Sequence, residues 1–205
     1  MLAFAHLSLT HRSMTSTASP AATPATLYQR VMGVDFDRLS SPVARFHRLA
    51  GAQVLHGQVQ VQAPASLLGR VLAWGLGAPQ QAGQGAIRFE LDATPGAEVW
   101  TRIFPTRTMR STLREAPGFV EEHMGAARLL FGLTAVEGGR LEMRLVRMRF
   151  LGIPCPRWLQ PAIVARETGQ GDDQLHFDVQ ATVPWIGRVV AYRGHLQVPA
   201  DAKCA

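Results

Sequence analysis

The side chains best suited to acid–base chemistry form one short cluster, Glu121, Glu122 and His123. On a β-strand, alternate side chains point to opposite faces, so Glu121 and His123 would share a face and Glu122 would point away. A zinc site would need further ligands, and the other histidines lack the H-x-H or H-x-x-x-H spacing of metal ligands. The cluster fits solvated strand charges, and we expect no metal and no cofactor.

Residues that could act as nucleophiles lack the partners that such chemistry needs. No G-x-S-x-G motif is present, and Cys155 lies between Pro154 and Pro156, where a packed thiol fits better than a nucleophile. The glycine-rich stretch at 75–83 follows a predicted helix, whereas a nucleotide-binding loop follows a strand. The sequence leaves catalysis open and favours a protein without it.

The residues Trp100, Arg102 and Phe104 alternate along one predicted strand and so share one face. If that face is inside, Arg102 is a buried cation that needs a partner, and it would suit an anionic group in a cavity. If the face is outside, Arg102 stacks on the two aromatic rings. Tyr192 lies on the apolar face of the last strand, where its hydroxyl would bond either the core or a ligand.

The segment "FLGIPCPRWLQPAI", residues 150–163, is apolar although it lies between two predicted strands. Three prolines keep it out of a regular strand ladder. Its apolar side chains either plug one end of the fold or form a rim that admits an apolar ligand or touches a membrane. Arg157 beside Trp158 fits an interfacial anchor, and "VPWIGR" places Trp185 in a second such turn.

The elements that must position these residues are mostly strands. Alternating patterns and short turns predict about nine strands in antiparallel connection. So many consecutive strands favour an antiparallel β-barrel or a strongly curved β-roll, because open edges are a liability. In "RLEMRLVRMRF" the apolar positions change phase at Val146 and Arg147, which predicts a β-bulge.

Three helices complete the expected fold. Thr26 caps the first helix and Gly33 ends it, Ser41 caps the second with Pro42 at its start, and residues 64–77 form an inserted helix. That inserted helix is too apolar for a narrow stripe, so we expect it to be mostly covered or to lie against something apolar. The composition divides the chain into a disordered tail, 1–25, and one β-rich domain, 26–200.

Charge and composition narrow the partners. The net charge is +6, and residues 100–157 hold ten arginines and five acidic residues. Such a basic stretch could meet a phosphate, a lipid headgroup or an acidic partner. Nucleic acid is disfavoured, because helix-turn-helix, zinc-finger and RNA-binding-sheet patterns are missing. Two cysteines make no disulfide framework, which favours a reducing, cytoplasmic location, with contact at the membrane periphery left open.

Several stretches together resemble a known family: "LYQRVMGVDFDRLSSPVARFH", "VWTRIFPTRTMRS", "FLGIPCPRWLQP", "ARETG" and "LHFDVQATVPWIGRVVAYRGHL". In this order, over residues 27–198, they resemble the bacterial domain of unknown function 4166. The resemblance implies a domain that stands alone or follows a saccharopine-dehydrogenase-like Rossmann domain, and it brings no catalytic residues.

These observations predict a non-catalytic binding module for an apolar, anionic, lipid-like ligand. The expected binding residues are Trp100, Arg102, Phe104, Trp158, Trp185 and Tyr192. The alternative is an accessory domain whose apolar end docks on a protein partner, such as a dehydrogenase-like subunit. A cavity of roughly 300–1,000 Å³ would favour the ligand, and a filled barrel would favour docking.

Overall fold

The computed structural model describes residues 24–199, so most of the tail predicted at 1–25 lies outside the described residues. The elements are α1 (Leu27–Met32), the 3-10 helix η1 (Gly33–Arg38), α2 (Ser41–Phe46), β1 (Gly51–Gln62), α3 (Leu67–Gly75), β2 (Gly83–Thr94), β3 (Ala97–Ile103), β4 (Thr108–Ala116), β5 (Phe119–Met124), β6 (Ala127–Val136), β7 (Arg140–Phe150), β8 (Ile153–Pro154), β9 (Ala162–Gln170), β10 (Gln174–Val183) and β11 (Gly187–Gln197).

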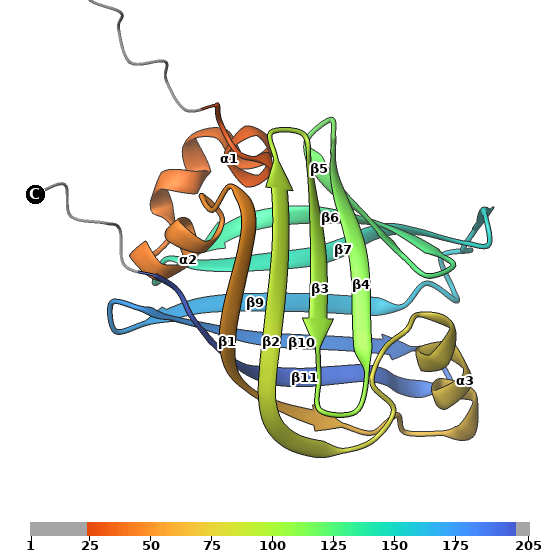
Figure 1. Ribbon diagram of the computed structural model, residues 1–205. Helices are drawn as coiled ribbons and strands as arrows, with labels where there is room; N and C mark the ends of the chain where they lie inside the picture. The colour runs from red at the N-terminus through yellow and green to blue at the C-terminus, as the bar shows by residue number, and fades with distance from the viewer. Residues whose placement is uncertain (1–23, 200–205) are drawn as a thin grey trace, which may run out of the picture.

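The strands form a closed antiparallel barrel (Figure 1), which confirms the predicted fold class. Each strand pairs with its neighbours in the order β6-β5-β4-β3-β2-β1-β11-β10-β9-β7, and the pairing of β6 with β7 closes the ring. The barrel therefore has ten strands, one more than expected, and the two-residue β8 adds a short pairing at the end of β7. Closure leaves the barrel strands without free edges.

Alternation along the strands places apolar side chains inside the barrel. In β2, Ile87, Phe89 and Leu91 are buried, whereas Arg88 and Asp92, which point to the other face, are exposed. Fully burying such a side chain stabilises a fold by about 1.5–3 kcal/mol.

The predicted β-bulge in β7 is confirmed. Phe131 pairs with Leu145, but the preceding Leu130 pairs with Arg147, so Val146 is the extra residue. The bulge keeps Leu145 and Met148 packed against the core while Arg147 remains exposed. A bulge increases local bending, which a closing barrel requires.

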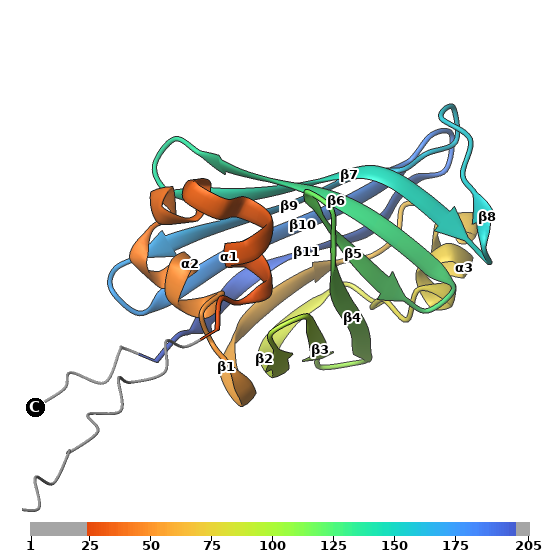
Figure 2. The same ribbon diagram turned by 90° about the horizontal axis from the view of Figure 1, so that it is seen from above.

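The N-terminal helices close one end of the barrel, on the left in Figure 2. Leu27 and Tyr28 of α1, Phe36 of η1 and Val43 of α2 are almost fully buried. Thr26 caps α1 through a capping box, as predicted, and Gly33 ends the helix with a positive φ of 55°. The start of α2 was predicted one residue late, because Ser40 is its N-cap and Ser41 is its first residue.

The opposite end carries α3 and the connections 63–82, 104–107, 125–126, 151–161 and 184–186, which together are called the α3 end. Ser66 caps α3 and also donates a hydrogen bond to the carbonyl of Ile186, 2.9 Å away. Arg107 donates a hydrogen bond to the carbonyl of Gly77 at the other end of the helix. These bonds hold α3 on the barrel. No helix among residues 24–199 is long and apolar enough to cross a membrane.

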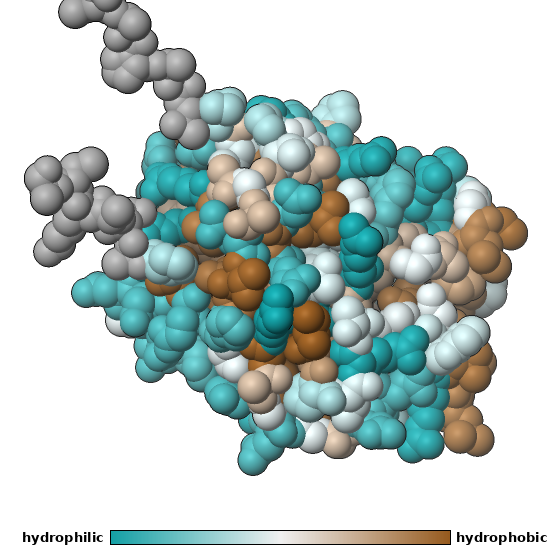
Figure 3. All heavy atoms as spheres, in the orientation of Figure 1, coloured by the Kyte–Doolittle hydropathy of each residue, from teal (hydrophilic) through white to brown (hydrophobic). Residues whose placement is uncertain are grey.

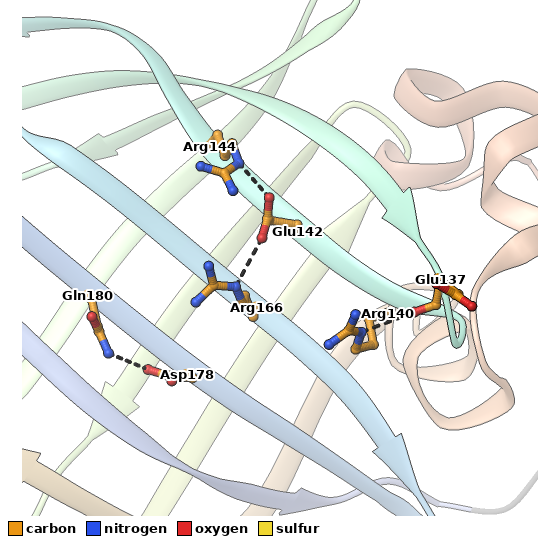
Figure 4. A network of polar contacts seen from close by, with 7 residues as sticks. All are labelled: Glu137, Arg140, Glu142, Arg144, Arg166, Asp178 and Gln180. Atoms are coloured by element: carbon orange, nitrogen blue, oxygen red, sulfur yellow. Dashed lines mark hydrogen bonds and ion pairs between the residues drawn. The ribbon is translucent and has the colours of Figure 1, made fainter.

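A charged network on the outer face joins β7 to β9 (Figure 4). Glu142 lies opposite Arg166 in the ladder and accepts a hydrogen bond from its Nε at 2.9 Å. Arg144 of β7 donates a second bond to the same carboxylate. Hydrogen bonds from Arg166, and then from Arg144, lower the pKa of Glu142.

This lowered pKa predicts a pH-dependent contribution to stability. The contribution is complete above the ordinary glutamate pKa of about 4.3 and is lost as the pH falls through the lower folded-state pKa. Glu142→Gln should lower the free energy of unfolding near neutral pH by about 0.5 kcal/mol, since solvent screens the pair. Urea unfolding across a pH series should show this difference vanish in acid. A stability difference that grows as the pH falls would contradict a lowered pKa for Glu142.

The seam between β1 and β11 requires glycine at position 57. A Cβ atom added to Gly57 would overlap the carbonyl oxygen of His195 on the neighbouring strand. Gly83, at the start of β2, has nothing within 4 Å of such an atom. The two positions therefore form a matched pair.

Gly57→Ala should lower the free energy of unfolding by about 3 kcal/mol or more, because backbone must move to admit the methyl group. Gly83→Ala should change it by less than about 0.5–1 kcal/mol. Chemical unfolding of both variants measures the effect. Equal stability of the two variants would show that the strands are further apart than described.

Candidate functional site

The barrel encloses a cavity of about 270 Å³. It extends from Phe46 of α2 to Leu72 of α3 and Leu76, which caps the end of that helix. Apolar side chains make up most of its lining, and its ionisable lining residues are Arg102, Glu122, Cys155, Glu167 and Tyr192. The volume lies just below the roughly 300–1,000 Å³ typical of ligand pockets, and it equals about nine waters at ~30 Å³ each. The barrel interior is therefore not completely filled by side chains, and its free volume is slightly smaller than that of a typical ligand pocket.

Arg102 lies inside the barrel, so the Trp100 face of β3 is the inner face. Its guanidinium donates a hydrogen bond to Ser111 Oγ of β4 at 3.1 Å and lies 3.4 Å from Glu122 Oε1 of β5. Its Cζ atom is also 4.9 Å from the centre of the Trp100 ring. The alternative that this face is inside is therefore confirmed, because Arg102 is buried and paired. The alternative that the face is outside is wrong, although Arg102 does stack on an aromatic ring.

Glu122 is the partner that a buried arginine requires. It points inward while Glu121 and His123 pair on the outer face at 2.7 Å, which confirms the predicted division of this cluster. Burial tends to lower the pKa of Arg102, but the nearby Tyr192 and Glu122 oxygens outweigh that effect and raise it. The guanidinium stays charged inside the barrel.

Tyr192 of β11 also lines the cavity, and β11 is separated from β3 by β2 and β1 in the strand order. Burial raises the pKa of its phenol, so it is neutral at ordinary pH and can donate a hydrogen bond. The buried ring of Phe104 packs against the Tyr192 ring, with ring centroids 5.1 Å apart in an edge-to-face arrangement. Trp100, Arg102 and Tyr192 therefore line the cavity, and Phe104 supports the phenol ring.

Sequence reasoning missed a second group of buried polar residues near α2. His47 Nε2 lies 2.6 Å from Glu167 Oε2 of β9, and Trp100 Nε1 donates to Glu98 at 2.8 Å. Burial raises the pKa of Glu98. His47 and Glu167 are 120 residues apart, so no local pattern could have joined them. Glu98 was within reach of the alternation argument, because it shares the inner face of β3 with Trp100 and Arg102.

Cys155 contributes a thiol to the cavity lining. Burial raises the pKa of the Cys155 thiol, which keeps it protonated and poorly nucleophilic at neutral pH. Within residues 24–199, no three His, Cys, Asp or Glu side chains are grouped so that they could hold a metal ion. The arrangement suits binding: an apolar chamber whose few ionisable groups are the Arg102–Glu122 pair, Glu167, Cys155 and the Tyr192 phenol.

The other two predicted residues, Trp158 and Trp185, lie outside the cavity. Both are largely exposed at the α3 end, and their ring centroids are 5.9 Å apart. The two apolar loops therefore do cluster, as the sequence argument required.

The inserted helix α3 departs from its predicted environment. The following large apolar side chains of α3 are exposed: Leu67, Leu68, Val71 and Trp74. Leu72 and the C-cap residue Leu76 turn inward to the cavity, and Ala73 is fully buried. The alternative that α3 is mostly covered is wrong for its outer face, because in the described chain the helix packs on the barrel along one side only. The alternative that it lies against something apolar stays a prediction.

The proline-rich segment 151–161 has two sides. Leu159 and Pro161 line the cavity, whereas Leu151 and Ile153 are exposed. Contrary to the expectation that prolines keep it out of the ladder, Ile153 and Pro154 form the short strand β8 beside β7. Pro154 is tolerated there because β8 is a two-residue strand with one neighbour.

Fold and site together define a closed antiparallel β-barrel with an apolar cavity and a buried ion pair. Residues 39–196 match the family model described as "Domain of unknown function (DUF4166)", and the chain belongs to that family. No curated protein matches the chain.

Leu151 and Trp185 hold backbone conformations that glycine normally occupies. Their φ angles are 51° and 60°, and they are the only non-glycine residues with positive φ in the described part of the chain. The left-handed region costs a non-glycine residue about 1–2 kcal/mol. Folding stability therefore does not explain leucine and tryptophan at these positions.

Trp185→Gly should leave the free energy of unfolding unchanged or raise it by up to about 1 kcal/mol, since relief of the positive φ offsets the added freedom of the unfolded chain. Thermal unfolding of Trp185→Gly and Leu151→Gly checks this. A loss of more than about 1 kcal/mol in the tryptophan variant would mean that its contact with Trp158 stabilises the fold.

Proposed function

We propose that this protein is a non-catalytic binding module for an apolar, lipid-like ligand held inside the barrel, with the ligand's anionic end at Arg102. The observation that carries the proposal is the apolar cavity of about 270 Å³ with few polar groups on its wall. Ligand pockets are commonly apolar chambers in which a few polar groups set the orientation.

The geometry around Arg102 supports the position of the anionic end. A guanidinium has five N–H donors, and Ser111 and Glu122 take only part of them. The 3.4 Å separation from Glu122 exceeds the roughly 2.7–2.9 Å of a strong charge-assisted hydrogen bond. Tyr192, which also lines the cavity, adds a further donor.

The presence of Glu122 decides which variants test the idea. Arg102→Met alone would leave a buried carboxylate without its partner, which costs about 3–5 kcal/mol. Arg102→Met combined with Glu122→Leu removes both charges and is expected to be near neutral for folding. Glu122→Gln keeps the cation and removes the carboxylate that competes with the ligand.

The experiment is a titration with a medium-chain fatty acid and its methyl ester. Wild type should bind the acid more tightly than the ester, and Glu122→Gln should widen that preference. The double variant should bind the ester about as wild type does and lose about tenfold in affinity for the acid, which corresponds to ~1.4 kcal/mol. Thermal unfolding of each variant controls for folding.

Two outcomes would reject the proposal in different ways. A double variant that binds the acid like wild type would remove Arg102 from the site. If wild type bound neither compound, the alternative of a docking domain for a protein partner would take its place.

A further inference from the structure

The α3 end combines exposed apolar side chains with one sign of charge. Its five connections contain no Asp or Glu, and they carry Arg70, Arg107 and Arg157. The other end is mixed, with Asp35 in η1, Glu137 after β6 and Asp173 before β10 among its acidic residues. The charge of the described chain is therefore polarised along the barrel axis.

Two further arginines at this end lie at positions that destabilise the fold. Arg128 at the start of β6 lies directly opposite Arg149 near the end of β7. Both are exposed, and neither forms an ion pair with another residue of the range 24–199. Like charges directly opposite one another destabilise a strand pair. An external anion would relieve this repulsion.

The apolar residues of the same end project outward. Figure 3 shows hydrophobic side chains gathered at the right-hand edge, over α3 and the β7–β8 end. The exposed large apolar residues of the α3 end are Leu67, Leu68, Val71, Trp74, Leu151, Ile153, Trp158 and Trp185. Leu151 and Trp185 are held out on the two strained turns. Strain at an exposed turn is often kept for function.

We propose that the α3 end docks on the surface of an anionic lipid bilayer. Tryptophan and leucine insert at the boundary between headgroups and acyl chains, and arginines pair with the anionic headgroups. A bilayer fits better than a protein partner, because a charge of one sign around an apolar patch complements a uniformly anionic, apolar layer.

The cavity gives this docking a consequence, which rests on the proposed function. Three residues of this end line the cavity and are only partly buried: Leu72 of α3, its C-cap residue Leu76, and Ile186 of the turn that carries Trp185. At the other end, the N-terminal helices close the barrel with almost fully buried side chains. A ligand that passes between cavity and surroundings at the α3 end would therefore enter the bilayer rather than water.

Co-sedimentation of the full chain with vesicles tests the docking. Vesicles of phosphatidylcholine mixed with phosphatidylglycerol should bind the chain, pure phosphatidylcholine should bind it far less, and added salt should weaken binding. Trp185→Gly should reduce binding at least about tenfold, through lost apolar area. Arg149→Gln should reduce it about fivefold, the effect of one basic residue near such a surface.

Matched controls lie at the other end of the molecule. Val34→Ser removes an apolar side chain that is 87% exposed on η1, and Arg140→Gln removes an exposed arginine at the far end of the same strand β7. Both should bind vesicles like wild type. Trp185→Gly is also expected to fold at least as well as wild type, so its loss of binding would not reflect unfolding.

Several results would overturn the proposal. One is a wild-type chain that stays in solution with anionic vesicles, and another is a Trp185→Gly variant that sediments with them like wild type. A third is a chain that forms dimers through Trp185 and ignores vesicles, which would make this surface an interface between copies. Filling the cavity by Ala181→Phe should abolish ligand binding and leave vesicle binding intact, so the two proposals fail separately.

Discussion

The burial of the Arg102 guanidinium inside an apolar barrel is the constraint on which the interior depends. A buried cation must be paired, and its partners come from consecutive strands: Ser111 on β4 and Glu122 on β5. Trp100 supplies an aromatic face on the same strand as the cation. These contacts require the β3–β4–β5 register that the ladder shows, because a slip of one residue would turn each of these side chains outward.

The two ends of the barrel are closed in different ways. The N-terminal helices act as a plug, and the stacked Tyr28 and His47 rings, 3.7 Å apart, lie within it. His47 reaches Glu167 of β9 and so ties α2 to the barrel wall. The α3 end has no comparable plug in the described residues, and its apolar side chains face both inward and outward. Arg102 and Glu122 lie two and three residues before the 104–107 and 125–126 connections, so the ion pair of the cavity lies toward the α3 end.

Alternation was enough to predict the strands, the curved antiparallel architecture and the bulge at Val146, because each leaves a local trace of period two. The same logic placed Glu122 on the opposite face of its strand from Glu121. It could not pair Glu122 with Arg102, since that contact depends on the register of β3, β4 and β5. His47 and Glu167 meet only because the chain closes on itself. The sequence could not decide whether α3 is covered by the fold or lies against something apolar outside it, because both environments favour the same apolar composition.

The central claim is that the barrel interior holds an apolar ligand. Native mass spectrometry of the full chain, purified without detergent from the cells that express it, tests this most directly. The account predicts a bound species of lipid-like mass in wild type and its loss in Ala181→Phe, whose added ring occupies the cavity. Detection of wild type only at the mass of the protein alone would contradict this claim. So would a bound species that is still present in Ala181→Phe.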